Sequence, residues 1–81
     1  MNNTIITGAS RGIGFDVAVQ LARQGHRVLA LSRDEKNLKA LKKQAGENLD
    51  YLAFDLLQPD ARALFDKVKP MGRVDVLINN A

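Results

Sequence analysis

The sequence contains no cysteine and no tryptophan, and it has one histidine and one tyrosine. The absence of cysteine excludes a disulfide framework, a thiolate zinc site and a cysteine nucleophile. A lone histidine, His26, argues against a metal site, because structural metals are held by several His or Cys ligands. We therefore expect no bound metal, and we expect His26 to lie in a surface loop.

Long hydrophobic runs are also missing. No apolar stretch reaches the roughly 18 residues that a membrane-spanning helix needs. The first four residues, Met-Asn-Asn-Thr, have neither the basic nor the apolar region of a signal peptide. These absences favour a soluble, cytoplasmic protein that contacts no membrane.

Size and charge are ordinary for one globular domain. The chain has 81 residues, of which 46% are hydrophobic and 26% are charged, and its net charge is +3. The basic residues are spread along the chain, and their densest run, from Lys36 to Lys43, falls on a predicted helix. Nucleic-acid-binding proteins usually gather basic residues into a stripe. We therefore interpret the charge as a solvated surface and expect no nucleic-acid partner.

Two periodicities alternate along the chain. Short β-branched or apolar runs predict strands over residues 4–7, 27–32, 49–54 and 74–78. Helical spacing predicts one helix over 13–24, which Gly25 ends, and a second that Asp34 caps and Gly46 ends. Pro59 and Asp60 open a third helix, and Pro70 closes it.

Each predicted helix carries an apolar stripe that would face a sheet. The stripes are Ile13, Val17 and Leu21 with Ala18 and Ala22 beside them; Leu38, Leu41 and Ala45; and Ala61, Leu64, Phe65 and Val68. The other aromatic side chains, Phe15, Tyr51 and Phe54, are also expected to pack in or near the core.

The resulting order is β-α-β-α-β-α-β. Such alternation with short connections predicts an α/β fold in which right-handed crossovers make the strands parallel. Nearly continuous apolar strands favour a doubly wound sheet that is buried on both faces.

The sharpest motif joins the first strand to the first helix. It reads Thr7-Gly8-Ala9-Ser10-Arg11-Gly12-Ile13-Gly14, with glycines spaced G-x-x-x-G-x-G. Glycines let a phosphate approach the backbone, and a helix N-terminus offers free N–H groups and a positive dipole end. A P-loop is excluded because no Gly-Lys-Ser/Thr follows. The alternative is a glycine-rich turn that binds nothing.

This loop resembles the cofactor loop of the short-chain dehydrogenases/reductases. Two more stretches resemble family motifs: Asp55-Leu56 after the third strand, and Asn79-Asn80-Ala81, which matches the start of Asn-Asn-Ala-Gly. The resemblance implies a Rossmann-type sheet of order 3-2-1-4, with residues 1–81 as the N-terminal half of an NAD(P)-binding domain. It implies that the cofactor is bound by Gly8, Ser10, Arg11, Gly12, Ile13, Gly14, Ser32, Arg33, Asp55, Leu56, Asn79, Asn80 and Ala81.

The end of the second strand distinguishes the two dinucleotides. A carboxylate there would favour NAD(H), whereas this chain has Ser32-Arg33. Arg33, together with Arg11 in the glycine loop, suits a 2′-phosphate. We therefore predict NADP(H) in preference to NAD(H). The alternatives are that both arginines are solvated loop residues and that Asp55 is a water-facing strand end.

No catalytic residue is predicted within the 81 positions. In the resembling family the acid/base tyrosine lies in Tyr-x-x-x-Lys, after the Asn-Asn-Ala-Gly motif. The printed chain stops at Ala81. The resemblance therefore implies a cofactor-binding segment of an NADP-dependent oxidoreductase, truncated before its catalytic half and incompetent alone. The complete enzyme would act on a carbonyl or alcohol substrate and form a homo-oligomer.

Two other functions stay open. One is a stand-alone, non-catalytic dinucleotide-binding module. The other is an interaction domain that binds no nucleotide, including an RNA-binding one. In each case the fourth strand is expected to form an open, apolar edge, and the short chain is expected to be only marginally stable.

Overall fold

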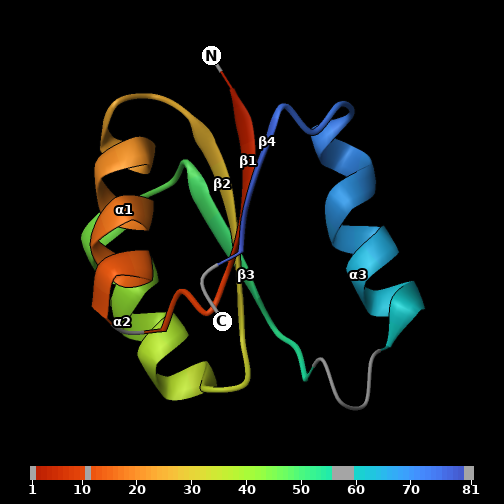
Figure 1. Cartoon of the computed structure of the whole chain (residues 1–81), viewed down its shortest axis with the longest axis horizontal. Helices are drawn as coiled ribbons and strands as arrows, with labels where there is room; N and C mark the ends of the chain where they lie inside the picture. Colours follow the sequence, from red (N-terminus) through yellow and green to blue (C-terminus); the bar gives the residue numbers. More distant parts are fainter. Residues whose placement is uncertain (1, 11, 56–59, 80–81) are drawn as a thin grey trace.

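A computed structural model describes residues 2–10, 12–55 and 60–79. Strands and helices alternate as expected (Figure 1). The elements are β1 (Asn3–Thr7), α1 (Gly12–Arg23), β2 (Arg27–Ser32), α2 (Glu35–Ala45), β3 (Leu49–Ala53), α3 (Ala61–Val68), the 3₁₀ turn η1 (Lys69–Met71) and β4 (Val76–Asn79).

The strands form one parallel sheet in the order β3-β2-β1-β4, which confirms the predicted α/β topology. The register aligns the strand ends. Thr7 of β1 lies opposite both Leu31 of β2 and Asn79 of β4. Leu31 in turn lies opposite Leu52 of β3. All four strands therefore end at about the same level.

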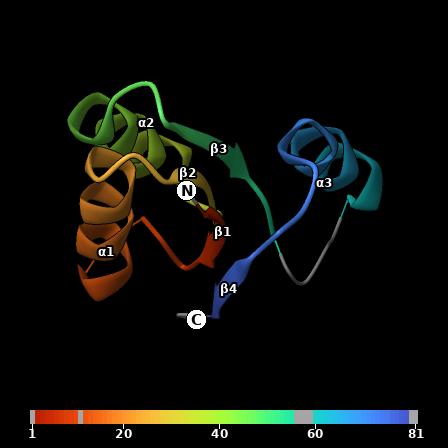
Figure 2. The ribbon, with the colours of Figure 1, turned by 90° about the horizontal axis from the view of Figure 1, so that it is seen from above.

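Helices cover both faces of the sheet, as Figure 2 shows: α1 and α2 lie on one side and α3 on the other. Each side has its own apolar cluster. Ile6, Val28 and Leu41 belong to the cluster beneath α1 and α2. Leu29 and Met71 belong to the cluster beneath α3. Residues of one strand alternate between the faces, so neighbours such as Val28 and Leu29 enter different clusters.

Among the described strands, only β2 is buried along most of its length. All four residues from Val28 to Leu31 in β2 are buried, as predicted for a strand covered on both faces. In β4, by contrast, Val76 is 36% exposed and Leu77 is 67% exposed. The fourth strand also begins at Val76 and not at Val74 as predicted. Just before it, the Asp75 N–H donates to the carbonyl of Asn3, the first residue of β1, at 2.9 Å.

The buried line of α1 differs from the predicted one. Ile13 is 76% exposed, and the buried positions are Gly14, Ala18 and Ala22. These residues repeat every four positions, and each directly follows one residue of the predicted stripe, Ile13, Val17 and Leu21. Small side chains let the helix backbone approach the sheet closely, so these residues form the part of α1 that faces the sheet. Val17 and Leu21 pack against the cluster from its flanks.

The prediction for Phe65 in α3 is wrong. Its side chain is 61% exposed, and the Lys69 ammonium lies 5.9 Å from the ring centre. Leu64 and Val68, which are four residues apart, pack toward the sheet. Phe65 follows Leu64 by one residue, or about 100° around the helix, so it leaves that face.

Asp34 caps α2 as predicted, and Asp60, which was predicted to open α3, is found to cap it. Asp34 accepts a hydrogen bond from the backbone N–H of Asn37, and Asp60 accepts one from that of Ala63, each at 3.1 Å. Gly46 ends α2 with a φ of +88°. The predicted role of Pro59 lies outside the described residues.

Candidate functional site

The carboxyl edge of the sheet brings together the segments that the sequence motifs single out. Gly8 follows β1, Arg33 follows β2, Asp55 lies beyond β3, and Asn79 ends β4. The backbone N–H of Phe54 donates to the Ser32 carbonyl at 2.7 Å, which keeps the end of β3 beside that of β2. In open parallel sheets, ligands bind in the crevice outside this edge.

The glycine loop has the backbone geometry that its motif predicts. Gly8 and Gly12 have φ values of +65° and +64°, a region that side-chain-bearing residues rarely adopt. The N–H of Ala9 donates to the Leu31 carbonyl at 3.4 Å and ties the loop to β2. A Cβ atom at Gly12 would meet no atom within 4 Å, so the space beside this glycine is open.

The start of α1 suits an anion. The helix begins at Gly12 and has no acidic residue in its first turn, so the positive end of its dipole is not neutralised there. Gly14 is buried in the first turn and lets the helix pack closely. Ile13, whose side chain is largely uncovered, stands between these two glycines.

The turn after β2 holds Arg33 at the same edge. The Ser32 hydroxyl oxygen accepts a hydrogen bond from the Asp34 N–H at 3.2 Å, and the Asp34 carboxylate caps α2. That carboxylate is thus engaged at a helix N-terminus. Arg33 is exposed, and it belongs to none of the ion pairs found among the described residues. The edge therefore presents a guanidinium on a turn that two hydrogen bonds hold.

The structure describes some of the other predicted site residues and leaves the rest outside its described ranges. Asp55 and Ser10 are half-buried, and Asn79 lies opposite Thr7. The predictions for Arg11, Leu56, Asn80 and Ala81 lie outside the described residues.

Away from this edge, the described residues form a groove on the α3 side of the sheet. The groove, of about 500 Å³, lies between α3 and the amino-terminal parts of β2 and β3, and Arg27, Asn48 and Met71 help to line it. Within the described ranges, no group of three or more His, Cys, Asp or Glu residues could hold a metal ion. None of the helices there is long and apolar enough to cross a membrane.

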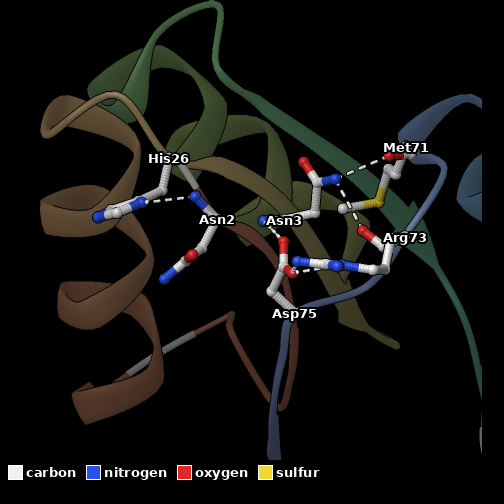
Figure 3. A network of polar contacts seen from close by, with 6 residues as sticks. All are labelled: Asn2, Asn3, His26, Met71, Arg73 and Asp75. Atoms are coloured by element: carbon white, nitrogen blue, oxygen red, sulfur yellow. Dashed lines mark hydrogen bonds and ion pairs between the residues drawn. The ribbon is translucent and has the colours of Figure 1, made fainter.

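No sequence motif points to a polar network at the amino end of the sheet, where Asn3 contacts Asp75 (Figure 3). The same region holds His26, whose Nδ1 accepts a hydrogen bond from the Asn2 N–H at 3.1 Å. His26 therefore joins a helix exit to the start of β1. Asn and Asp are common in turns, so their types alone do not distinguish this network from ordinary loops.

Comparison with known families gives a match along nearly the whole chain. The family model described as short chain dehydrogenase matches residues 2–81. Short-chain dehydrogenase/reductase 1 of Saponaria officinalis is 42% identical over 85 residues, which cover 95% of this chain and 28% of that protein. A probable NADP-dependent dehydrogenase of Dichelobacter nodosus is 40% identical over 79 residues, covering 95% and 74%. The chain thus spans little more than a quarter of the Saponaria relative's length.

Solved structures agree with the fold and its strand order. A metagenomic short-chain oxidoreductase in complex with NADP has a TM-score of 0.84 and 40% identity, covering 99% of this chain and 38% of its own. A short chain dehydrogenase from Bacillus anthracis has a TM-score of 0.87 and 29% identity, covering 99% and 34%. With the glycine loop and the parallel sheet, these matches show that the chain belongs to the short chain dehydrogenase family.

Proposed function

We propose that these residues form the NADP(H)-binding part of an oxidoreductase that transfers hydride between NADP(H) and a carbonyl or alcohol substrate. The observation that carries the proposal is the glycine loop, with positive φ at Gly8 and Gly12, which opens α1 at the sheet edge where the exposed Arg33 also lies. Support also comes from the NADP named for the metagenomic structure and from the name of the Dichelobacter relative.

The loop would hold the pyrophosphate. The N–H groups at the start of α1 would donate to its oxygens, and the open space at Gly12 leaves room for its approach. Ser10 would add a hydroxyl donor, and Ile13 would cover the ligand with an apolar surface. These residues bind and orient the dinucleotide; the bound cofactor supplies the hydride.

The adenosine end would lie across the ends of β2, β3 and β4. Arg33, with Arg11, would bind the 2′-phosphate, and the Ser32 hydroxyl would replace the carboxylate that NAD(H) binding favours. Asp55 would accept from the adenine amino group, with the Leu56 N–H nearby. The ribose would be lined by the remaining residues of the predicted site, Asn79, Asn80 and Ala81.

We assign no acid–base catalyst within these 81 residues. The single tyrosine, Tyr51, lies in β3 and packs against the core, and Asp55 stands four positions later where a Tyr-x-x-x-Lys motif would need lysine. The proposed contribution of the 81 residues is therefore cofactor binding and not proton transfer. For the whole protein we propose a homo-oligomer with a small-molecule substrate and no nucleic-acid partner.

The test is a calorimetric titration of the protein with NADPH, because the proposed contacts are with the pyrophosphate and adenosine and calorimetry reports binding at either. The same titration with NADH measures the preference between the two cofactors. We expect saturable NADPH binding that 2′,5′-ADP displaces, and weaker NADH binding. No saturable binding of either dinucleotide would refute the proposal. Equal affinities would refute the NADP(H) preference alone.

A further inference from the structure

The amino end of the sheet holds a compact set of polar contacts around Asn3, the first residue of β1 (Figure 3). The Asn3 side-chain amide donates to the carbonyl oxygens of Met71 and Arg73, each at 2.7 Å. Its backbone N–H donates to Oδ2 of Asp75 at 3.0 Å, and its carbonyl accepts from the Asp75 N–H at 2.9 Å. One residue of β1 therefore holds three residues of the segment that leads into β4.

The second centre of this set is the Asp75 carboxylate. Its Oδ1 accepts from Nε of Arg73 at 2.8 Å and lies 2.7 Å from Nη2 of the same guanidinium. The Asp75 side chain is 19% exposed, whereas that of Arg73 is 87% exposed. Arg73 thus closes over the carboxylate from the solvent side. Two hydrogen bonds lower the pKa of Asp75: the larger effect comes from the Asn3 N–H and the next from the Arg73 side chain.

The side chains of β4 specify its register weakly. The strand has four residues, and Leu77 is 67% exposed and Val76 36% exposed. Ile78 packs against the core. Register is strongly specified where a buried face would be lost by a one-residue slip, and weakly where little is buried. Contacts outside the strand must therefore contribute to its alignment with β1.

We propose that Asn3 and Asp75 form a register clamp, which aligns β4 with β1 and so sets Asn79 opposite Thr7 at the far edge of the sheet. Asn3 and Asp75 are positioning residues and touch no ligand themselves. A slip of one residue would move Asn79 by about 3.3 Å along the strand, which exceeds the tolerance of a hydrogen bond. The effect on cofactor binding rests on the proposed function, whereas the alignment of β4 does not.

The experiment compares Asp75→Ala, Asp75→Asn and Asp66→Ala by amide hydrogen exchange. Asp66 is an exposed residue of α3, so its replacement controls for loss of one negative charge. In Asp75→Ala we expect the amides of residues 76–79 to exchange at least tenfold faster, with residues 28–31 unchanged. Asp75→Asn should have a smaller effect, because its amide oxygen can still accept from the Asn3 N–H. The control should match the parent protein.

A second measurement connects the clamp to the site. The Kd for NADPH should rise at least fivefold in Asp75→Ala, less in Asp75→Asn, and by less than twofold in the control. Unchanged exchange in β4, or equally faster exchange throughout the sheet, would overturn the clamp. Faster exchange in β4 with an unchanged Kd would overturn its positioning role.

The two proposals fail in different ways. If the parent protein binds no NADPH, the proposed function fails, and the exchange measurement still decides on the clamp. If Asp75→Ala does not fold, the decision passes to Asp75→Asn and to Asn3→Asp, which cannot donate to the Met71 and Arg73 carbonyls. In both variants, faster exchange confined to β4 is expected, and unchanged exchange would overturn the clamp.

Discussion

Replacement of Arg33 by alanine should remove much of the preference for NADPH over NADH. Arg33 is exposed on a turn that is held by the hydrogen bond from the Asp34 N–H to the Ser32 hydroxyl and by the Asp34 cap. Neither contact involves the guanidinium, so the substitution should leave the turn intact. It should remove an interaction with the 2′-phosphate that NADH lacks.

The size of the effect follows from the kind of contact. A hydrogen bond to a charged group contributes about 1.5–3 kcal/mol, which corresponds to a loss of affinity of about 10- to 150-fold. Solvent reaches Arg33, so the lower part of this range is expected, a loss of about tenfold. Affinity for NADH should change by less than about twofold. Arg33→Asp should give a larger loss, because its carboxylate would repel the phosphate.

The assay is the calorimetric titration with both cofactors at two salt concentrations. Arg62→Ala is the matched control, because it removes an exposed arginine from α3, on the opposite face from α1 and α2. The difference between parent and Arg33→Ala should shrink at high salt, since salt screens exposed charges. Equal losses for NADPH and NADH, or no loss for either, would refute the assignment of Arg33 to the 2′-phosphate.

Four further predictions concern the loop, a cap, the core and acid stability. Gly12→Val should abolish binding of both dinucleotides in the titration, because a branched side chain would fill the pyrophosphate space and strain a φ of +64°; retained binding would contradict the loop's role. Asp34→Ala should lower the free energy of unfolding in urea by about 1 kcal/mol through loss of the α2 cap; no change would contradict that cap. Leu41→Ala should lower it by about 2–5 kcal/mol, because Leu41 is fully buried; a smaller loss would indicate a core that collapses around the cavity. The pKa of Asp75 is lowered in the fold from its ordinary 3.8, so its ionised form stabilises the protein above that pH and the contribution is lost as pH falls through the folded pKa. The stability difference between the parent and Asp75→Asn should therefore shrink on acidification below 3.8, and a constant difference would contradict this origin.

Much of the fold could be predicted because its signals are local. Asp34 and Asp60 cap helices through contacts with residues three positions away, so the sequence pattern contains both partners. Gly8 and Gly12 mark the loop because their backbone conformation disfavours side chains. The strand order follows from the resemblance that these short motifs carry, and the structure confirms it.

The candidate site was predictable to a similar extent. Its residues lie at strand ends, and parallel strands deliver their carboxyl ends to one edge of the sheet. The sequence could therefore bring Gly8, Arg33 and Asp55 to that edge without any knowledge of side-chain contacts. Only the structure shows that the Asp34 carboxylate caps α2. Only the structure shows that Arg33 belongs to none of the ion pairs among the described residues.

By itself, then, the sequence determined the order of elements, the helix caps and the glycine loop, because each depends on residues within a few positions of one another. Only the tertiary structure decided which line of α1 faces the sheet, since Ile13 and Gly14 are adjacent and both fit helical spacing. It also decided the exposure of Phe65 and the contact between Asn3 and Asp75, which are 72 residues apart. Such features depend on how separate elements pack against one another, and a short stretch of sequence does not determine that packing.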